Sequence, residues 1–188
     1  ATIRAEVLSI GGEINLAEIL QTSGYKTAAI GKWHLGVGSN YSPNHRGFDY
    51  FFGFERGVSN YYPELLTLDS YSEVTERYGW QKLKILENEK PVEINSYLTD
   101  ALSSSAVEFI ERSKKDPFFL YLAFNAPHSP MQADQVVYDG INDIKDPSRR
   151  TYAAMVKSLD NGIGNVLDKL TELNLEDNTM IIFLSDNG

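Results

Sequence analysis

Five polar side chains in this sequence follow apolar runs closely enough to act together. Lys32 and His34 come within four residues of the first run, and His128 comes within four residues of the next. Asp186 and Asn187 come within three residues of the last run. If these runs are parallel strands, their carboxyl ends meet at one edge of the sheet, where ligands bind in such proteins. Neighbouring strands lie about 4.7 to 4.9 Å apart, so all five side chains would face one small ligand.

These residue types together suit the hydrolysis of an anionic ester. Lys32 supplies a fixed positive charge for a phosphate or sulfate, and the two histidines exchange protons near neutral pH. A protonated imidazole would give its proton to the leaving oxygen. Asp186 and Asn187 offer two hard oxygen ligands for a divalent cation, whereas calcium takes about six to eight oxygens. The remaining metal ligands must therefore come from elsewhere.

Each of these residues also has a simpler interpretation. A lysine near a strand end is usually a solvated surface charge, but Lys32 lies between glycine and tryptophan in an apolar turn, which favours a site. His128, flanked by prolines, would otherwise be a loop histidine bonded to a backbone carbonyl. Asp186 and Asn187 precede a glycine and would otherwise form a turn. His45 is interpreted as a loop residue rather than a ligand.

The first helix and strand are indicated by local signals. Asn15 and Glu18 form a capping-box pattern, which predicts a helix start, and Gly24 ends this helix. Residues 26–30 are a short apolar run that Gly31 stops, which predicts a buried strand.

Two further helix and strand pairs repeat this arrangement. Apolar residues at helical spacing predict helices at residues 97–112 and about 147–173. Apolar runs predict strands at residues 118–124 and 180–184. Helices that alternate with apolar strands predict an α/β fold with a mostly parallel sheet covered by helices on both faces.

The stretch between the first two pairs has a different character. Residues 36–63 are rich in glycine, asparagine, serine and aromatics, which indicates a long loop that is functional or locally packed. The aromatic residues 48–54 are interpreted as packing that holds this loop. Residues 80–94 alternate around Glu87-Asn88-Glu89-Lys90, which predicts a hairpin on the rim of the sheet.

The composition excludes several classes of protein. The chain has 188 residues with 17 Lys and Arg against 26 Asp and Glu, a net charge of −9, which argues against a nucleic-acid partner. No apolar run approaches the roughly 20 residues needed to cross a membrane, so no transmembrane segment is expected. There is no cysteine, so any metal must use oxygen or imidazole ligands.

Several segments resemble the formylglycine-dependent sulfatases. Residues 24–36, GYKTAAIGKWHLG, closely resemble the second signature of that family, which is a long and specific pattern. Other segments are similar to family segments in the same order along the chain: residues 46–54, 117–122, 125–130 and 178–188. The resemblance implies the alkaline-phosphatase-like architecture of these enzymes, which hydrolyse sulfate monoesters.

The resemblance also implies roles for the five polar residues. Lys32 would contact the sulfate and the nucleophile, and His34 would hydrogen-bond a hydroxyl of the hydrated formylglycine aldehyde. His128 would face the sulfate and the leaving oxygen as a donor or general acid. Asp186 and Asn187 would ligate a divalent ion, which is Ca²⁺ in most of the family.

The sequence departs from the family pattern in three features. There is no Cys or Ser followed by x-Pro-x-Arg before the first helix, no pair of aspartates near the start and no second sulfate-binding lysine beyond the last run. We therefore expect residues 1–188 to be the central part of a sulfatase catalytic domain, with the N-terminal nucleophile segment and the C-terminal part absent. The formylglycine is expected in the parent protein, and the segment alone is expected to be inactive.

The resemblance implies a sulfated small molecule or sulfated glycan as substrate, and an extracytoplasmic or lysosomal location. Two alternatives remain open. One is a phosphodiesterase or phosphonate hydrolase of the same superfamily, which would differ most in the nucleophile segment. The other is a non-catalytic, anion-binding homologue, which would bind calcium weakly or not at all.

Overall fold

The computed structural model describes residues 13–38 and 40–185. The predicted capping box is confirmed at the start of α1 (Leu16–Thr22): Glu18 N donates to Asn15 Oδ1 at 3.0 Å, and Asn15 N donates to Glu18 Oε2 at 2.8 Å. Gly24 follows the helix with a φ of +89°, a conformation that glycine adopts without strain. The chain then enters the first strand, as predicted.

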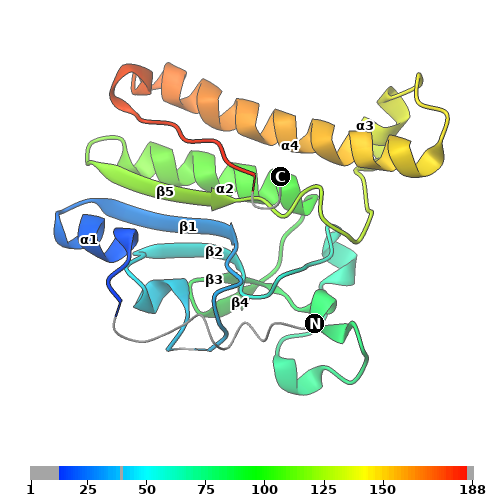
Figure 1. The fold of residues 1–188 in the computed structure, drawn as a ribbon, viewed down its shortest axis with the longest axis horizontal. Coiled ribbons are helices and arrows are strands. Elements are labelled where there is room, and N and C mark those ends of the chain that lie inside the picture. Colours follow the sequence, from blue (N-terminus) through cyan, green and yellow to red (C-terminus); the bar gives the residue numbers. More distant parts are fainter. Residues whose placement is uncertain (1–12, 39, 186–188) are drawn as a thin grey trace.

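Three parallel strands form the centre of the sheet. They are β1 (Lys26–Lys32), β2 (Tyr50–Phe54) and β5 (Phe118–Ala123), and β1 lies between the other two (Figure 1). The interpretation of residues 48–54 as loop packing is wrong for residues 50–54, which form the strand β2. These aromatics pair with β1 from Ala28↔Tyr50 to Lys32↔Phe54, because a buried strand such as β1 needs a hydrogen-bonding neighbour on each side.

The predicted rim hairpin is confirmed and extends the sheet. It consists of β3 (Ile85–Glu87) and β4 (Lys90–Val92), with Asn88 at a φ of +55° in the turn. The strand β3 pairs antiparallel with β2, so the strand order is β4-β3-β2-β1-β5. The sheet is therefore mixed, and the expected α/β class with a parallel centre is confirmed.

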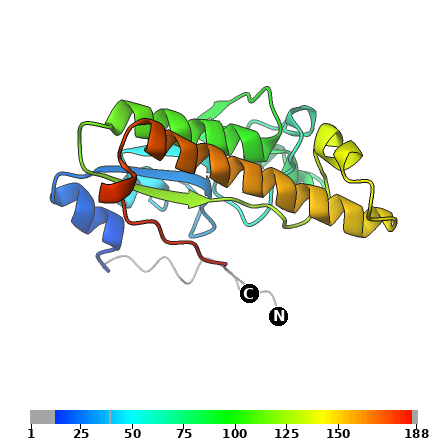
Figure 2. The same ribbon diagram turned by 90° about the horizontal axis from the view of Figure 1, so that it is seen from above.

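Helices cover both faces of this sheet, as Figures 1 and 2 show. On one face, α2 (Leu98–Ser113) packs on β1 and β5, and α4 (Pro147–Glu172) packs on α2. The short α3 (Gln135–Gly140) packs against α4. On the other face, α1 packs on β1 around a smaller core that contains Trp33 and Phe51. Both predicted long helices are confirmed to within one residue at each end.

The prediction of a strand at residues 180–184 is wrong. These residues follow α4 as extended chain outside any described strand (red in Figure 2). Their side chains are 56–86% exposed, from Ile181 to Met180. An apolar run becomes a strand only where a neighbouring edge offers it hydrogen bonds, and no described β pairing includes this segment.

No helix in the described ranges is long and apolar enough to cross a membrane.

Candidate active site

Lys32 is the last residue of β1. The sequence pattern predicted instead that Lys32 lies beyond the strand. The strand continues two residues past Ile30, because Gly31 pairs with Gly53 on one side and Ala123 on the other. A Cβ at Gly31 would lie 2.0 Å from the Ala123 carbonyl oxygen, so only glycine allows this close approach. The half-buried Lys32 is thereby held at the carboxyl edge of the sheet.

His34 continues the contact between β1 and β2. Its backbone N–H donates to the Glu55 carbonyl at 3.0 Å, and its φ of +56° turns the chain sharply. One side of the imidazole is open to solvent, and the other lies against Gly57, where a Cβ would come within 2.7 Å of both Cε1 and Nε2. His34 is therefore positioned by β2 as well as by its own strand.

The pKa of His34 is lowered from its usual value of 6.5. The first cause is partial burial of the ring, and the positive charges of Lys32, His128 and Arg56 lower the pKa further. His34 is therefore neutral at pH 7, and it accepts a proton more readily than it donates one.

His128 lies in the loop after β5. Its backbone N–H donates to the Asn125 carbonyl at 2.8 Å, and its own carbonyl accepts the Tyr61 hydroxyl at 2.9 Å. The ring Nδ1 lies 2.8 Å from the Ser129 carbonyl oxygen. Because a carbonyl can only accept, we assign the hydrogen of the neutral ring to Nδ1. Nε2 is then the ring nitrogen that can accept a hydrogen bond on this exposed side chain.

The structure brings Lys32, His34 and His128 together at the carboxyl edge of adjacent strands. The charges of Lys32 and His128 also lower the pKa of His34, in agreement with this placement. Arg56 also belongs to this group and is not among the site residues predicted from the sequence. The signal for it is a cation two residues after the aromatic run 48–54, which contains a strand that ends at the same edge.

The predicted metal ligands Asp186 and Asn187 lie outside the described residues. Within the described ranges, no group of three or more His, Asp or Glu side chains could hold a metal ion. The described residues therefore do not form the predicted metal centre by themselves. Near this edge, the side-chain amide of Asn125 is buried, and neither its oxygen nor its nitrogen has a hydrogen-bond partner among the described residues.

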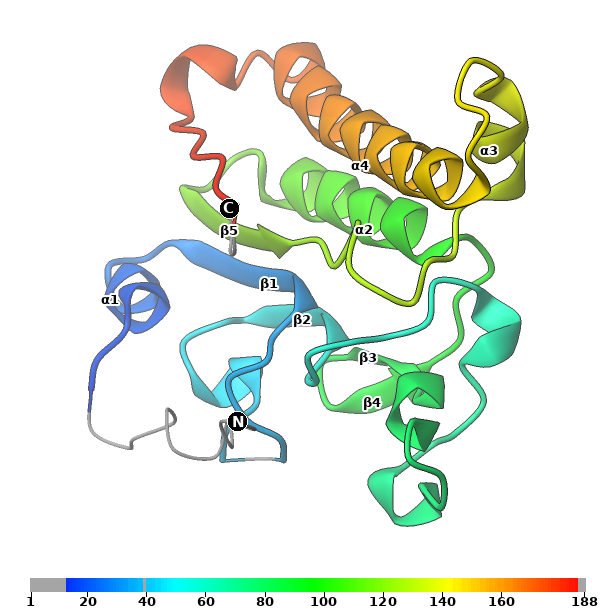
Figure 3. The same cartoon turned by 45° about the vertical axis from the view of Figure 1, so that its right-hand side comes forward.

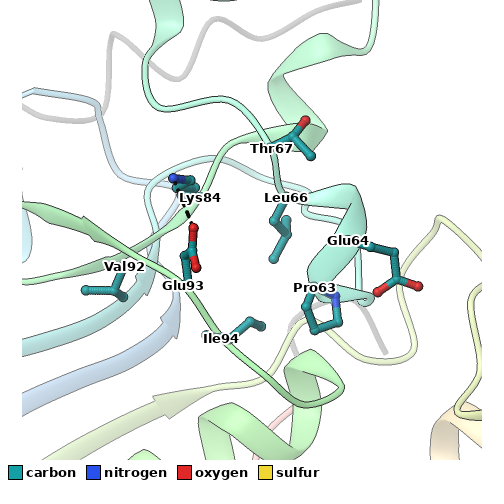
Figure 4. Close-up of a pocket in the computed structure, with 8 residues that line it drawn as sticks. All are labelled: Pro63, Glu64, Leu66, Thr67, Lys84, Val92, Glu93 and Ile94. Atoms are coloured by element: carbon teal, nitrogen blue, oxygen red, sulfur yellow. Dashed lines mark ion pairs between the residues drawn. The ribbon is translucent and has the colours of Figure 1, made fainter.

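A cavity of about 400 Å³ lies on the rim of the sheet, between residues 63–67 and the end of the hairpin (Figure 4). Lys84 on its wall is held by Asp69, 2.8 Å from Nζ, and by Glu93, 3.6 Å from Nζ. The pairing with Asp69 raises the pKa of Lys84. Since β3 runs antiparallel to β2, Lys84 precedes β3 at the same edge as Lys32, two strands away. The lining combines apolar and polar side chains: Pro63, Glu64, Leu66, Thr67, Lys84, Val92, Glu93 and Ile94.

Comparison with known proteins identifies the family. A family model described as Sulfatase matches residues 4–188. The chain belongs to the sulfatase family. Among its relatives, an uncharacterized sulfatase, YdeN, of Escherichia coli (strain K12) is 32% identical over 94% of this chain and 33% of that protein. Human Arylsulfatase G is 33% identical over 97% of this chain and 38% of that protein.

The fold agrees with this assignment. The crystal structure of Ps i-CgsB matches with a TM-score of 0.80 and 39% identity, covering 87% of this chain and 37% of that chain. The expected sulfatase, alkaline-phosphatase-like architecture is thus confirmed. The chain spans about 33–38% of the length of the curated relatives that it matches.

Proposed function

We propose that the protein containing this sequence hydrolyses sulfate monoesters with a formylglycine nucleophile and a divalent metal ion. The observation that carries the proposal is the meeting of Lys32, His34 and His128 at one edge of a sheet in a member of the sulfatase family. Residues 1–188 would form the central part of the catalytic domain, with the nucleophile segment before them. Formylglycine, once hydrated, would supply the hydroxyl group that attacks sulfur.

Lys32 would bind the sulfate oxygens. Its half-buried position at the end of β1, next to Trp33, fixes the backbone from which the ammonium group would reach the sulfate. A charge that needs no reorientation stabilises the negative charge that develops on the sulfuryl oxygens during transfer.

The two histidines would take opposite proton-transfer roles. His34 has a lowered pKa and is neutral at pH 7, so it can accept a proton from a hydroxyl group. His128 is exposed and directs Nδ1 to a carbonyl, so a protonated Nε2 would donate to the leaving alcohol oxygen. His34 would take up a proton and His128 would deliver one. The two rings together would therefore serve both directions of proton transfer.

Asp186 and Asn187 would supply two oxygen ligands to the metal ion, Ca²⁺ or another divalent cation, with the others supplied from outside this sequence. The ion would supply positive charge next to the sulfate. Near the end of β5, the buried amide of Asn125 lacks a hydrogen-bond partner among the described residues.

A sulfated glycan is the substrate class that we favour. Ps i-CgsB has also been crystallised in complex with k-i-k-neocarrahexaose, which is an oligosaccharide. The rim cavity beside Lys84 would accommodate part of the alcohol portion of such a substrate.

The test uses the full-length protein, matured so that formylglycine is present, with an aryl sulfate, an aryl phosphate diester and calcium. Release of the phenol from the sulfate at a higher kcat/KM than from the diester supports the proposal. Faster cleavage of the diester would favour the phosphodiesterase alternative. The absence of both turnover and calcium binding by calorimetry would favour a non-catalytic homologue.

The 188-residue chain alone, assayed in the same way, should release no phenol above buffer. Turnover by that chain would refute the view that the nucleophile lies outside it.

A further inference from the structure

Arg56 lies two residues beyond the end of β2, between two residues that contact His34. The pairing of β1 with β2 continues past Lys32↔Phe54, because Trp33 N donates to the Phe54 carbonyl and His34 N donates to the Glu55 carbonyl, both at 3.0 Å. On the other side of Arg56, Gly57 lies against the His34 ring. Figure 3 shows β1 and β2 running side by side.

The guanidinium group of Arg56 adds a full positive charge at this edge. The side chain is exposed, and its charge reaches both the His34 ring and the neighbouring Glu55. Glu55 is half-buried and accepts a backbone hydrogen bond from Gly38. The arginine is the more exposed of the two. In a chain with a net charge of −9, this edge therefore gathers cations.

This charge exceeds what one sulfate monoester requires. A sulfate monoester carries a single negative charge, which Lys32 and the metal ion already balance in the proposed reaction. Arg56 lies two residues beyond Phe54, the residue of β2 that pairs with Lys32, so the two side chains start from neighbouring positions at this edge. Two such side chains can hold two anionic groups on one sugar or on two linked sugars.

We propose that Arg56 binds a second anionic group, a sulfate ester or a carboxylate, of the molecule whose reacting sulfate lies at Lys32. This inference rests on the proposed sulfatase function and narrows its substrate to glycans with at least two anionic groups. The planar guanidinium forms two parallel hydrogen bonds to such groups, which lysine cannot reproduce.

The experiment compares two substrates on the full-length protein: an aryl sulfate with one charge and a disaccharide with two sulfates. Arg56→Ala should lower the ratio of kcat/KM for the disaccharide to kcat/KM for the aryl sulfate by about tenfold or more, the loss expected for a charged hydrogen bond. Arg56→Lys should recover part of the ratio. Lys115→Ala removes an exposed cation at the opposite edge, just before β5, and should leave the ratio unchanged.

An unchanged ratio in Arg56→Ala would overturn the inference, because Arg56 would then affect the cleavage of both substrates equally or of neither. A calorimetric titration of the disulfated disaccharide into full-length protein that has not been matured to formylglycine measures binding without turnover. Binding should weaken about tenfold in Arg56→Ala relative to the wild-type protein, and equal affinities would refute the inference. Failure of the wild-type protein to cleave either ester would instead refute the proposed function.

Discussion

The imidazole of His34 packs directly on the backbone of Gly57, and a Cβ at position 57 would lie 2.7 Å from two of its ring atoms. These residues follow the ends of two different strands and are brought together by the parallel pairing of β1 with β2. Position 57 therefore controls where the imidazole points. Since the contact is with the end of a side chain, a larger residue would displace the ring before it disturbed the sheet.

Gly57→Ala should lower kcat of the full-length enzyme by about tenfold or more while the protein stays folded, because small misplacements of a catalytic group are costly. Gly164→Ala is the matched control. It lies in α4 with no atom within 4 Å of the added methyl group, and it should stabilise the helix by up to about 1 kcal/mol without changing kcat. Equal kcat values for Gly57→Ala and the wild-type protein would show that the His34 ring position is unimportant.

Lys32→Ala should raise the reaction barrier by about 2.7–4 kcal/mol, which corresponds to a loss of about 10²–10³ in kcat. The physical reason is the removal of a pre-oriented charge beside the developing negative charge of the sulfate. Steady-state kinetics with an aryl sulfate measures the effect, and Lys115→Ala at the opposite edge is the control. An unchanged kcat would exclude Lys32 from the reaction.

His34 should titrate below pH 6.5, because partial burial and three nearby positive charges disfavour its protonated form. The acidic limb of kcat/KM, where a neutral His34 is required, should accordingly lie below this pH. Arg56→Gln removes one of the charges and should move the limb toward higher pH. An NMR titration of the His34 ring gives its pKa directly, and a value above 6.5 would contradict the proposed electrostatics.

Thr27→Val should destabilise the fold by about 1–3 kcal/mol, since it removes the hydrogen bond of the buried Gly47 carbonyl. The Thr27 hydroxyl is fully buried, donates to the Gly47 carbonyl at 2.7 Å and accepts from Asp49 N at 2.9 Å. Thr171→Val on the exposed side of α4 is the matched control. Urea unfolding measures both changes, and equal stabilities would mean that this link between β1 and β2 is unimportant.

Asp49 should make the fold sensitive to acid. Burial alone would raise its pKa, but hydrogen bonds from Gln21 and Thr27 and the charge of Lys26 lower the pKa overall. A carboxyl with a lowered pKa contributes stability that is complete above its unfolded pKa of about 3.9 and is lost as the pH falls through the folded pKa. Asp49→Asn should therefore reduce the loss of thermal stability between about pH 5 and about pH 2, the range over which this carboxyl takes up its proton. An identical pH dependence in both proteins would argue against this role.

Patterns that depend on near neighbours in the chain predicted much of the fold. The capping box joins Asn15 and Glu18, three residues apart, and helical spacing located α2 and α4 because each turn contacts the next. The hairpin turn at Asn88 is equally local. The sequence also predicted that Lys32, His34 and His128 follow strands, although it ended β1 two residues early.

The tertiary structure decided what depends on segments far apart. Residues 50–54 are a strand because β1 offers them an edge, whereas the equally apolar residues 180–184 have no such partner among the described strands. Arg56 and Gly57 reach His34 only through that same pairing, across 22 and 23 residues of sequence. Helix caps and turns are determined by residues within one turn of the chain. Strand pairing, and with it the membership of the site, is determined by hydrogen bonds that form only when distant segments meet.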